Sequence, residues 1–87
     1  SVASLAELCG LSPGHFIQAF TKTFGVPPYR YLINLRLGYA AELLTQTQLP
    51  ITEVAYLSGF SSQSHLTSTM RKYRQTTPAQ VRLGANV

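Results

Sequence analysis

Two stretches of similar sequence decide the fold, LAELCGLS at residues 5–12 and VAYLSGFS at residues 54–61. Each has an alanine near its start and a glycine four residues later, and the two glycines lie 49 positions apart. A small residue lets two helices pack closely, and glycine adopts the positive φ that reverses the chain between them. Because two helices joined by a short glycine-containing turn form a helix-turn-helix, the chain is predicted to contain this unit twice.

The similarity continues beyond the turns. The second copy carries one extra residue after its glycine, and the matching positions then lie 50 residues apart: His15, Phe16, Phe20, Lys22 and Pro28 match His65, Leu66, Met70, Lys72 and Pro78. One copy alone would also fit an αα corner of any helical bundle, but two copies in register favour a duplicated unit. The residues after the glycines, Leu11 and Phe60, are expected to fill the core beneath each turn.

Serine, threonine and proline positions predict where helices begin. Ser12 and Thr77 each offer a capping hydroxyl before a proline at the first helical position, and Pro28 and Pro50 mark two more starts. Apolar spacing predicts six helices, of which the third runs from about residue 28 to 46 and the last from about 78 to 83. No stretch alternates as a strand does, so an all-α fold is expected. The final residues, LGANV, are expected to fray.

The apolar stripes of these helices define the expected core. They comprise Val2, Leu5, Ala6 and Cys9; Phe16, Ala19, Phe20 and Phe24; Tyr29, Leu32, Ile33, Arg36, Ala40, Leu43 and Leu44; Ile51, Val54, Ala55 and Ser58; and Leu66, Thr69, Met70 and Tyr73. Cys9 is expected to be a small core hydrophobe, and a lone cysteine fits the reducing conditions of the cytoplasm. For Arg36 a structural role within the core is favoured, and a phosphate contact stays open.

Charge and composition narrow the function classes. Residues 1–60 hold three acids and three bases, whereas residues 61–87 hold four bases and no acid, so the net charge of +4 comes from the last third. Such a segment attracts polyanions, although a solvated basic helix is the alternative. One cysteine, two histidines, three glutamates and no aspartate form no catalytic or metal-ligand pattern, so no enzyme, metal or cofactor is expected. No apolar run is long enough to span a membrane.

The length of the third helix suggests a function for the duplication. Some twenty residues extend roughly 30 Å at 1.5 Å per residue. Major-groove faces on one side of B-DNA repeat about every 34 Å. A helix of this length could therefore hold two recognition helices in adjacent major grooves of double-stranded DNA.

The sequence also resembles a known family. LRLGYAAELL at residues 35–44 and ITEVAYLSGFSSQSHLTSTMRKYRQTTPAQVR at residues 51–82 are similar to the C-terminal DNA-binding domain of AraC/XylS-type transcription regulators of bacteria. The resemblance implies a homeodomain-like fold with two helix-turn-helix subdomains, 1–26 and 48–87, joined by a linker helix, 27–47. It further implies a family helix before Ser1, an effector or dimerisation domain elsewhere in the full-length chain, and contact with RNA polymerase.

The outward faces of the two recognition helices supply candidate DNA contacts, and in the resembled family these faces enter the major groove. The candidates for base contacts are Gly14, Ile17, Gln18, Gln63, Ser64, Thr67 and Ser68. Glutamine can bond adenine through two atoms, and Ile17 can pack on a thymine methyl. The candidates for phosphate contacts are Thr21, Lys22, His15, His65, Ile51, Arg71 and Lys72, with Ile51 acting through its backbone N–H. Ordinary solvent exposure is the alternative for any single one of them.

Two further expectations concern affinity and class. Many members of the resembled family carry arginine or lysine where this chain has Gln18, Thr21 and Ser68, and fewer charges release fewer counterions on binding. The first subdomain is therefore expected to contribute less affinity than the second. The alternative function is a helical protein–protein interaction module without DNA binding, in which Ile17, Leu37 and Tyr39 would form a docking patch.

Overall fold

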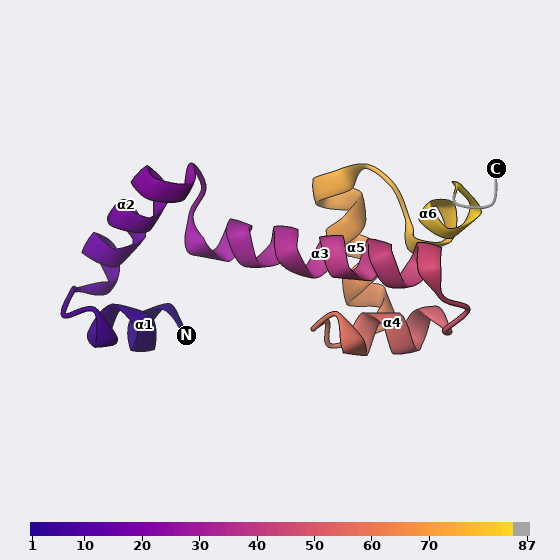
Figure 1. The fold of residues 1–87 in the computed structure, drawn as a ribbon, viewed down its shortest axis with the longest axis horizontal. Helices are drawn as coiled ribbons and strands as arrows, with labels where there is room; N and C mark the ends of the chain where they lie inside the picture. Colours follow the sequence, from indigo (N-terminus) through magenta and orange to yellow (C-terminus); the bar gives the residue numbers. More distant parts are fainter. Residues whose placement is uncertain (85–87) are drawn as a thin grey trace. The chain divides into compact units, whose positions relative to one another are not determined.

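The computed structural model describes residues 1–84, which are helical with short connections and contain no strand (Figure 1). The helices are α1 (Val2–Leu8), α2 (Pro13–Phe24), α3 (Pro28–Gln46), α4 (Ile51–Leu57), α5 (Gln63–Arg74) and α6 (Pro78–Gly84). The all-α prediction and the long third helix are confirmed. Leu83 and Gly84 belong to α6, so the fraying expected for them is wrong, and residues 85–87 lie outside the described part of the chain.

The chain divides into two compact units, residues 1–34 (unit 1) and residues 35–87 (unit 2). The boundary falls inside α3, so the beginning of this helix belongs to unit 1 and the rest to unit 2. The separate linker predicted at residues 27–47, between subdomains 1–26 and 48–87, stays a prediction.

Side-chain caps mark where α2, α5 and α6 begin. The Ser12 hydroxyl accepts a hydrogen bond from the His15 N–H at 3.3 Å, with Pro13 at the first helical position. Thr77 accepts in the same way from the Gln80 N–H at 3.2 Å. Both caps were expected, whereas that of Ser62, which accepts from the His65 N–H at 3.1 Å, was not. Each cap satisfies a backbone donor that the first turn of a helix leaves without an intrahelical partner.

Glycine reverses the chain in both predicted turns, with φ of 70° at Gly10 and 90° at Gly59. At Gly59 a second constraint applies, because a Cβ atom there would lie 2.9 Å from Nε of Arg36. The half-buried Arg36 side chain thus packs on the turn of unit 2. This contact supports the structural role favoured for Arg36.

Unit 2 contains a closed apolar core. Its buried apolar residues are Leu37, Ala40, Leu44, Val54, Ala55, Phe60, Leu66 and Met70. All but Leu37 were expected inside. Leu37 was instead assigned to the alternative docking patch, and the structure corrects this because Leu37 is fully buried. The error has a physical cause: α3 contributes to both units and has no single apolar stripe that marks its inner face.

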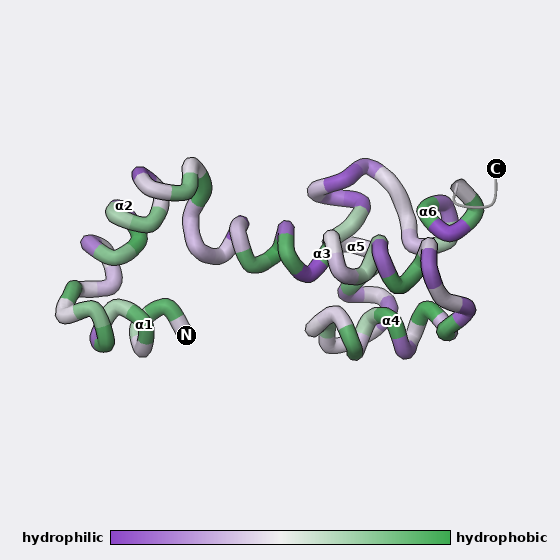
Figure 2. Tube along the Cα trace, in the orientation of Figure 1, coloured by the Kyte–Doolittle hydropathy of each residue, from purple (hydrophilic) through white to green (hydrophobic). Residues whose placement is uncertain are grey.

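Unit 1 buries far less, with only Ala6 and Ile33 buried among its apolar residues. Cys9, expected in the core, is exposed, because it caps the C-terminus of α1 outside the packed face. Leu5, Leu11, Ala19 and Phe24 are exposed as well, contrary to expectation. The apolar residues of α1 visible in Figure 2 therefore lie largely at the surface.

Aromatic rings replace a closed core in this unit. Phe20 packs on Phe24 and on Tyr31, with ring centroids 4.4 and 5.5 Å apart. Tyr29 and Leu32, both expected inside, are also exposed and line an open apolar hollow of about 390 Å³ with Leu5 and Phe20. Tilted and edge-on ring contacts of this kind stabilise the cluster.

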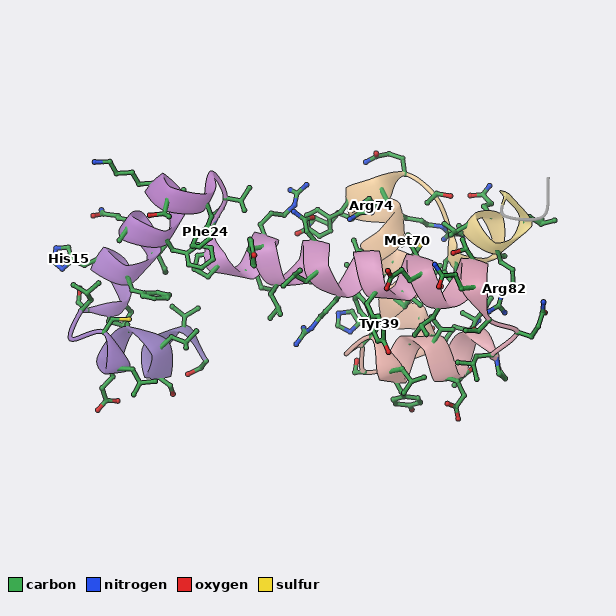
Figure 3. All side chains as sticks on the ribbon, viewed as in Figure 1. His15, Phe24, Tyr39, Met70, Arg74 and Arg82 are labelled. Carbon is green, nitrogen blue, oxygen red and sulfur yellow. The ribbon has the colours of Figure 1, made fainter. Side chains whose placement is uncertain are left out.

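Arg82 fastens α6 to the end of α3 (Figure 3). Its Nε donates to the Leu44 carbonyl at 3.1 Å and its Nη2 donates to the Thr47 carbonyl at 3.4 Å. Carbonyls at a helix C-terminus lack intrahelical partners and carry partial negative charge, so a guanidinium there satisfies both needs. Sequence reasoning counted Arg82 only as part of the basic segment and missed this contact.

Candidate nucleic-acid interface

The outer surface of α5 is polar and faces away from the core of unit 2. Leu66, Thr69 and Met70 are buried on one side of the helix. On the other side Gln63, Ser64, Ser68 and Arg71 are exposed and Thr67 is half-buried. These five residues line one hollow of about 380 Å³, so the structure gathers the predicted base contacts of α5 and Arg71 on one surface, here called the α5 reading face.

A second hollow adjoins the α5 reading face. It has a volume of about 220 Å³ and is lined by Ile51, Gln63, Thr67, Arg71, Thr77, Pro78 and Ala79. Ile51, a predicted phosphate contact, is half-buried and begins α4. Next to it the Thr52 hydroxyl donates to Oε1 of Gln63 at 2.8 Å. Two residues beside α5 were not among the predicted site residues. Thr52 lies in the first turn of α4, and Thr77 caps the start of α6.

The corresponding face of α2 carries fewer basic residues. Gly14, Ile17, Gln18 and Lys22 are exposed, and Ile17 is 38% exposed. Thr21 is half-buried and its hydroxyl donates to the Ile17 carbonyl at 2.7 Å. This bond uses the hydroxyl proton of Thr21, so only the oxygen lone pairs remain, and these repel phosphate rather than bind it. The prediction of a phosphate contact at Thr21 is weakened by this bond.

The two histidines lie at equivalent positions near the starts of α2 and α5. Figure 3 shows His15 projecting from the beginning of α2, and both side chains are exposed. Nδ1 of His15 lies 2.8 Å from the Ser12 hydroxyl, and Nδ1 of His65 lies 3.1 Å from the Ser61 hydroxyl. The extra residue in the second turn changes the serine partner, while in both units the contact uses Nδ1 of the ring.

Positive charge is concentrated at the end of α5. Arg71, Lys72 and Arg74 occupy its last turn, whereas Lys22 alone occupies that of α2. Lys72 places its ammonium 5.3 Å from the centroid of the Tyr73 ring, a cation–π contact. Cations at a helix C-terminus also offset the negative end of the helix dipole, so part of this charge stabilises α5 itself.

The side chains and helices of residues 1–84 show neither a metal-ligand cluster nor a membrane-spanning helix. No three histidine, cysteine or acidic side chains there come together as metal ligands would. In the same residues, none of the helices is both long and apolar enough to cross a lipid bilayer. The polar faces of α2 and α5 are the candidate sites that the chain presents.

Known proteins of similar sequence indicate the family to which these helices belong. The chain is 36% identical over 81 residues to an uncharacterized HTH-type transcriptional regulator of Haemophilus influenzae, covering 93% of the chain and 27% of that protein. A family model described as a helix-turn-helix domain matches residues 5–84. The chain belongs to the AraC-type helix-turn-helix family. The AraC-type resemblance predicted from the sequence is thereby confirmed.

Solved structures of similar fold agree with this assignment. An AraC-type transcriptional regulator from Chromobacterium violaceum is 33% identical with a TM-score of 0.84, covering 98% of this chain and 76% of that chain. The DNA-binding domain of AdpA, solved in complex with a target DNA, is 30% identical with a TM-score of 0.87, covering 97% and 76%. This AraC-type chain spans about a quarter to a third of the length of its first curated relatives.

Proposed function

We propose that this domain binds double-stranded DNA sequence-specifically as the DNA-binding part of a transcription regulator. The observation that carries the proposal is the α5 reading face, where hydroxyls, an amide and a guanidinium share one exposed surface. Hydroxyl and amide side chains match the donors and acceptors on base edges, and arginine matches phosphate or guanine. The AraC-type family and the AdpA domain solved with DNA support the same function.

The proposed mode of binding inserts α2 and α5 into adjacent major grooves. Each helix has twelve residues and an exposed face opposite its packed side. The helix between them, α3, has 19 residues, which corresponds to about 28 Å at 1.5 Å per residue. This length is close to the groove repeat of about 34 Å, so one chain would read two half-sites one helical turn apart.

We assign roles by chemistry. Gly14, Ile17 and Gln18 in α2 and Gln63, Ser64, Thr67 and Ser68 in α5 are proposed to face bases. Lys22, Arg71, Lys72, His15, His65 and the backbone of Ile51 are proposed to hold phosphates, with Thr21 the weakest candidate. Full-length function is proposed to involve RNA polymerase and an effector or dimerisation domain outside this chain, in the cytoplasm where bacterial DNA lies.

The salt dependence of DNA binding tests the proposal and the expected inequality of the two helices. The logarithm of the binding constant falls with the logarithm of salt concentration, with a slope set by the number of phosphate contacts. Arg71→Ala should reduce that slope by about one, and Lys22→Ala should reduce it by less. Arg30→Ala removes the same charge from α3 and serves as the control, with the smallest change expected.

The outcomes separate the competing interpretations. A larger change for Lys22→Ala than for Arg71→Ala would reverse the ranking of the two helices. Failure of the wild-type protein to bind mixed-sequence duplex at low salt would favour the protein-interaction module. Leu37 is buried and cannot belong to the docking patch of that alternative, whereas Ile17 and Tyr39 are exposed.

A further inference from the structure

Thr52 of α4 and Gln63 of α5 are joined by a hydrogen bond across the helix-turn-helix of unit 2. The Thr52 hydroxyl donates to Oε1 of Gln63 at 2.8 Å, and both side chains are exposed. Gln63 also lines both hollows beside α5. A glutamine at a surface otherwise samples many rotamers and can turn either its oxygen or its nitrogen outward. The bond to Thr52 restricts this choice.

We infer that Thr52 is a positioning residue that makes Gln63 a hydrogen-bond donor toward base edges and thereby sets which base Gln63 selects. The inference rests on the proposed DNA binding and adds a specificity rule to it. Bidentate recognition of adenine requires the amide oxygen to accept from N6 while the amide nitrogen donates to N7. In this structure the bond to Thr52 occupies one of the two lone pairs of the oxygen and holds it toward α4, so the Nε2 protons are the groups offered to a base.

Guanine is the base edge that suits such a donor. It offers two acceptors, O6 and N7, in the major groove, whereas adenine pairs one acceptor with a donor and cytosine offers a donor. Gln63 is therefore expected to prefer guanine to adenine and to disfavour cytosine. The sequence alone allows adenine as the base for either glutamine, and the Thr52 contact favours guanine for Gln63. Holding the amide before binding also lowers the entropy lost on contact with DNA.

Unit 1 lacks this arrangement. The positions that correspond to Thr52 and Gln63, 49 and 50 residues earlier, are Ala3 and Pro13, and neither side chain can form the bond. In α2 the exposed glutamine is Gln18, and within residues 1–84 its amide has no side-chain hydrogen-bond partner. Gln18 keeps both its oxygen and its nitrogen for adenine. The chain thus contains its own control, a glutamine that should be indifferent to Thr52.

The experiment compares Thr52→Val, which keeps the side-chain shape, with Thr52→Ser, which keeps the hydroxyl. Selection from randomised duplex with wild type, Gln63→Ala and Gln18→Ala identifies the base pair that each glutamine reads. Competition binding is then measured on four duplexes that differ only at the Gln63 position, and on four that differ only at the Gln18 position. Wild type and Thr52→Ser should prefer guanine at the Gln63 position, and Thr52→Val should shift the guanine-to-adenine ratio toward adenine by about tenfold.

The result at the Gln18 position should be the same for all three proteins. The inference is overturned if Thr52→Val ranks the four bases as wild type does, or if Thr52→Ser behaves like Thr52→Val. An equal loss of affinity for all duplexes in Thr52→Val would also overturn it, because the hydroxyl would then contact phosphate. These outcomes leave the proposed function standing, whereas absence of any duplex binding by wild type would remove the proposed function and this inference together.

Discussion

Units 1 and 2 contain the same sequence repeat but bury it to different depths. After the turn glycine, Leu11 is 40% exposed in unit 1, whereas Phe60 at the matching position is 2% exposed in unit 2. Phe16 and Phe20 are half-buried, while their counterparts Leu66 and Met70 are fully buried. The repeat therefore determines the local helix-turn-helix in both units without determining how well each unit excludes water.

The difference follows from what surrounds each repeat. Unit 1 consists of α1, α2 and the beginning of α3, within 34 residues, whereas unit 2 combines the rest of α3 with α4, α5 and α6. Because the fraction of surface that a chain buries rises with its size, the larger unit has the larger core. Thr52, Gln63 and the basic end of α5 lie on this better-packed unit, which suits a surface that must hold side chains in fixed positions.

The largest effect should come from truncating equivalent core positions. Leu66→Ala removes a fully buried side chain and should destabilise unit 2 by about 2–5 kcal/mol, since a cavity remains. Phe16→Ala at the matching position should cost about 1–2 kcal/mol, because Phe16 is already half-exposed. Hydrogen exchange measures both losses of stability. The amides of α4 and α5 report on Leu66→Ala, and the amides of α1 and α2 report on Phe16→Ala.

Hydrogen exchange of the wild-type protein is the reference for Leu66→Ala and Phe16→Ala. The amides of α1 and α2 should exchange faster than those of α4 and α5. Equal exchange, or a larger loss in Phe16→Ala than in Leu66→Ala, would mean that unit 1 is better packed than its exposed side chains indicate.

An intermediate effect is expected where α6 is fastened to α3. Arg82→Ala removes two hydrogen bonds from a charged donor to the Leu44 and Thr47 carbonyls and should destabilise unit 2 by about 1.5–3 kcal/mol. Arg82→Lys is the matched control, because an ammonium keeps the charge but cannot reproduce the geometry of the guanidinium. Thermal unfolding should rank wild type above Arg82→Lys and Arg82→Lys above Arg82→Ala. Equal stability of Arg82→Lys and wild type would show that charge alone stabilises this end of α3.

Sequence reasoning recovered the features that depend on neighbours along the chain. The six helices, the caps at Ser12 and Thr77, and the positive φ of Gly10 and Gly59 follow from local residue types, and the structure confirms them. It failed where the outcome depends on residues far apart in sequence. Cys9 and Leu11 fit an apolar pattern but are exposed in the smaller unit 1, and Leu37 is buried in the core of unit 2.

The candidate site divides in the same way. The outward faces of α2 and α5 could be predicted from helical periodicity, since the apolar stripe of each helix determines the opposite side. The contact between Thr52 and Gln63 could not, because it joins helices through a side-chain bond eleven residues apart in sequence. Arg82 was missed for a similar reason: its acceptors lie 38 and 35 residues away. Counting charges placed Arg82 among the basic residues expected to attract DNA, but its side chain donates to backbone carbonyls.

The smallest predicted effect tests whether the two units differ in backbone strain as well as in packing. α2 ends at Gly25 with φ of 80°, and α5 ends at Gln75, the matching position, with φ of 53°. A left-handed conformation costs a residue with a Cβ about 1 kcal/mol relative to glycine. Gln75→Gly should therefore stabilise unit 2 by about 0.5 kcal/mol, because the gain is offset by loss of the exposed bond from Gln75 Nε2 to the Lys72 carbonyl at 3.2 Å. Gly25→Gln is the reverse change in unit 1 and should cost about 1 kcal/mol. Denaturant unfolding of both variants checks the pair, and a loss of stability in Gln75→Gly would show that the side-chain bond outweighs the strain it accompanies.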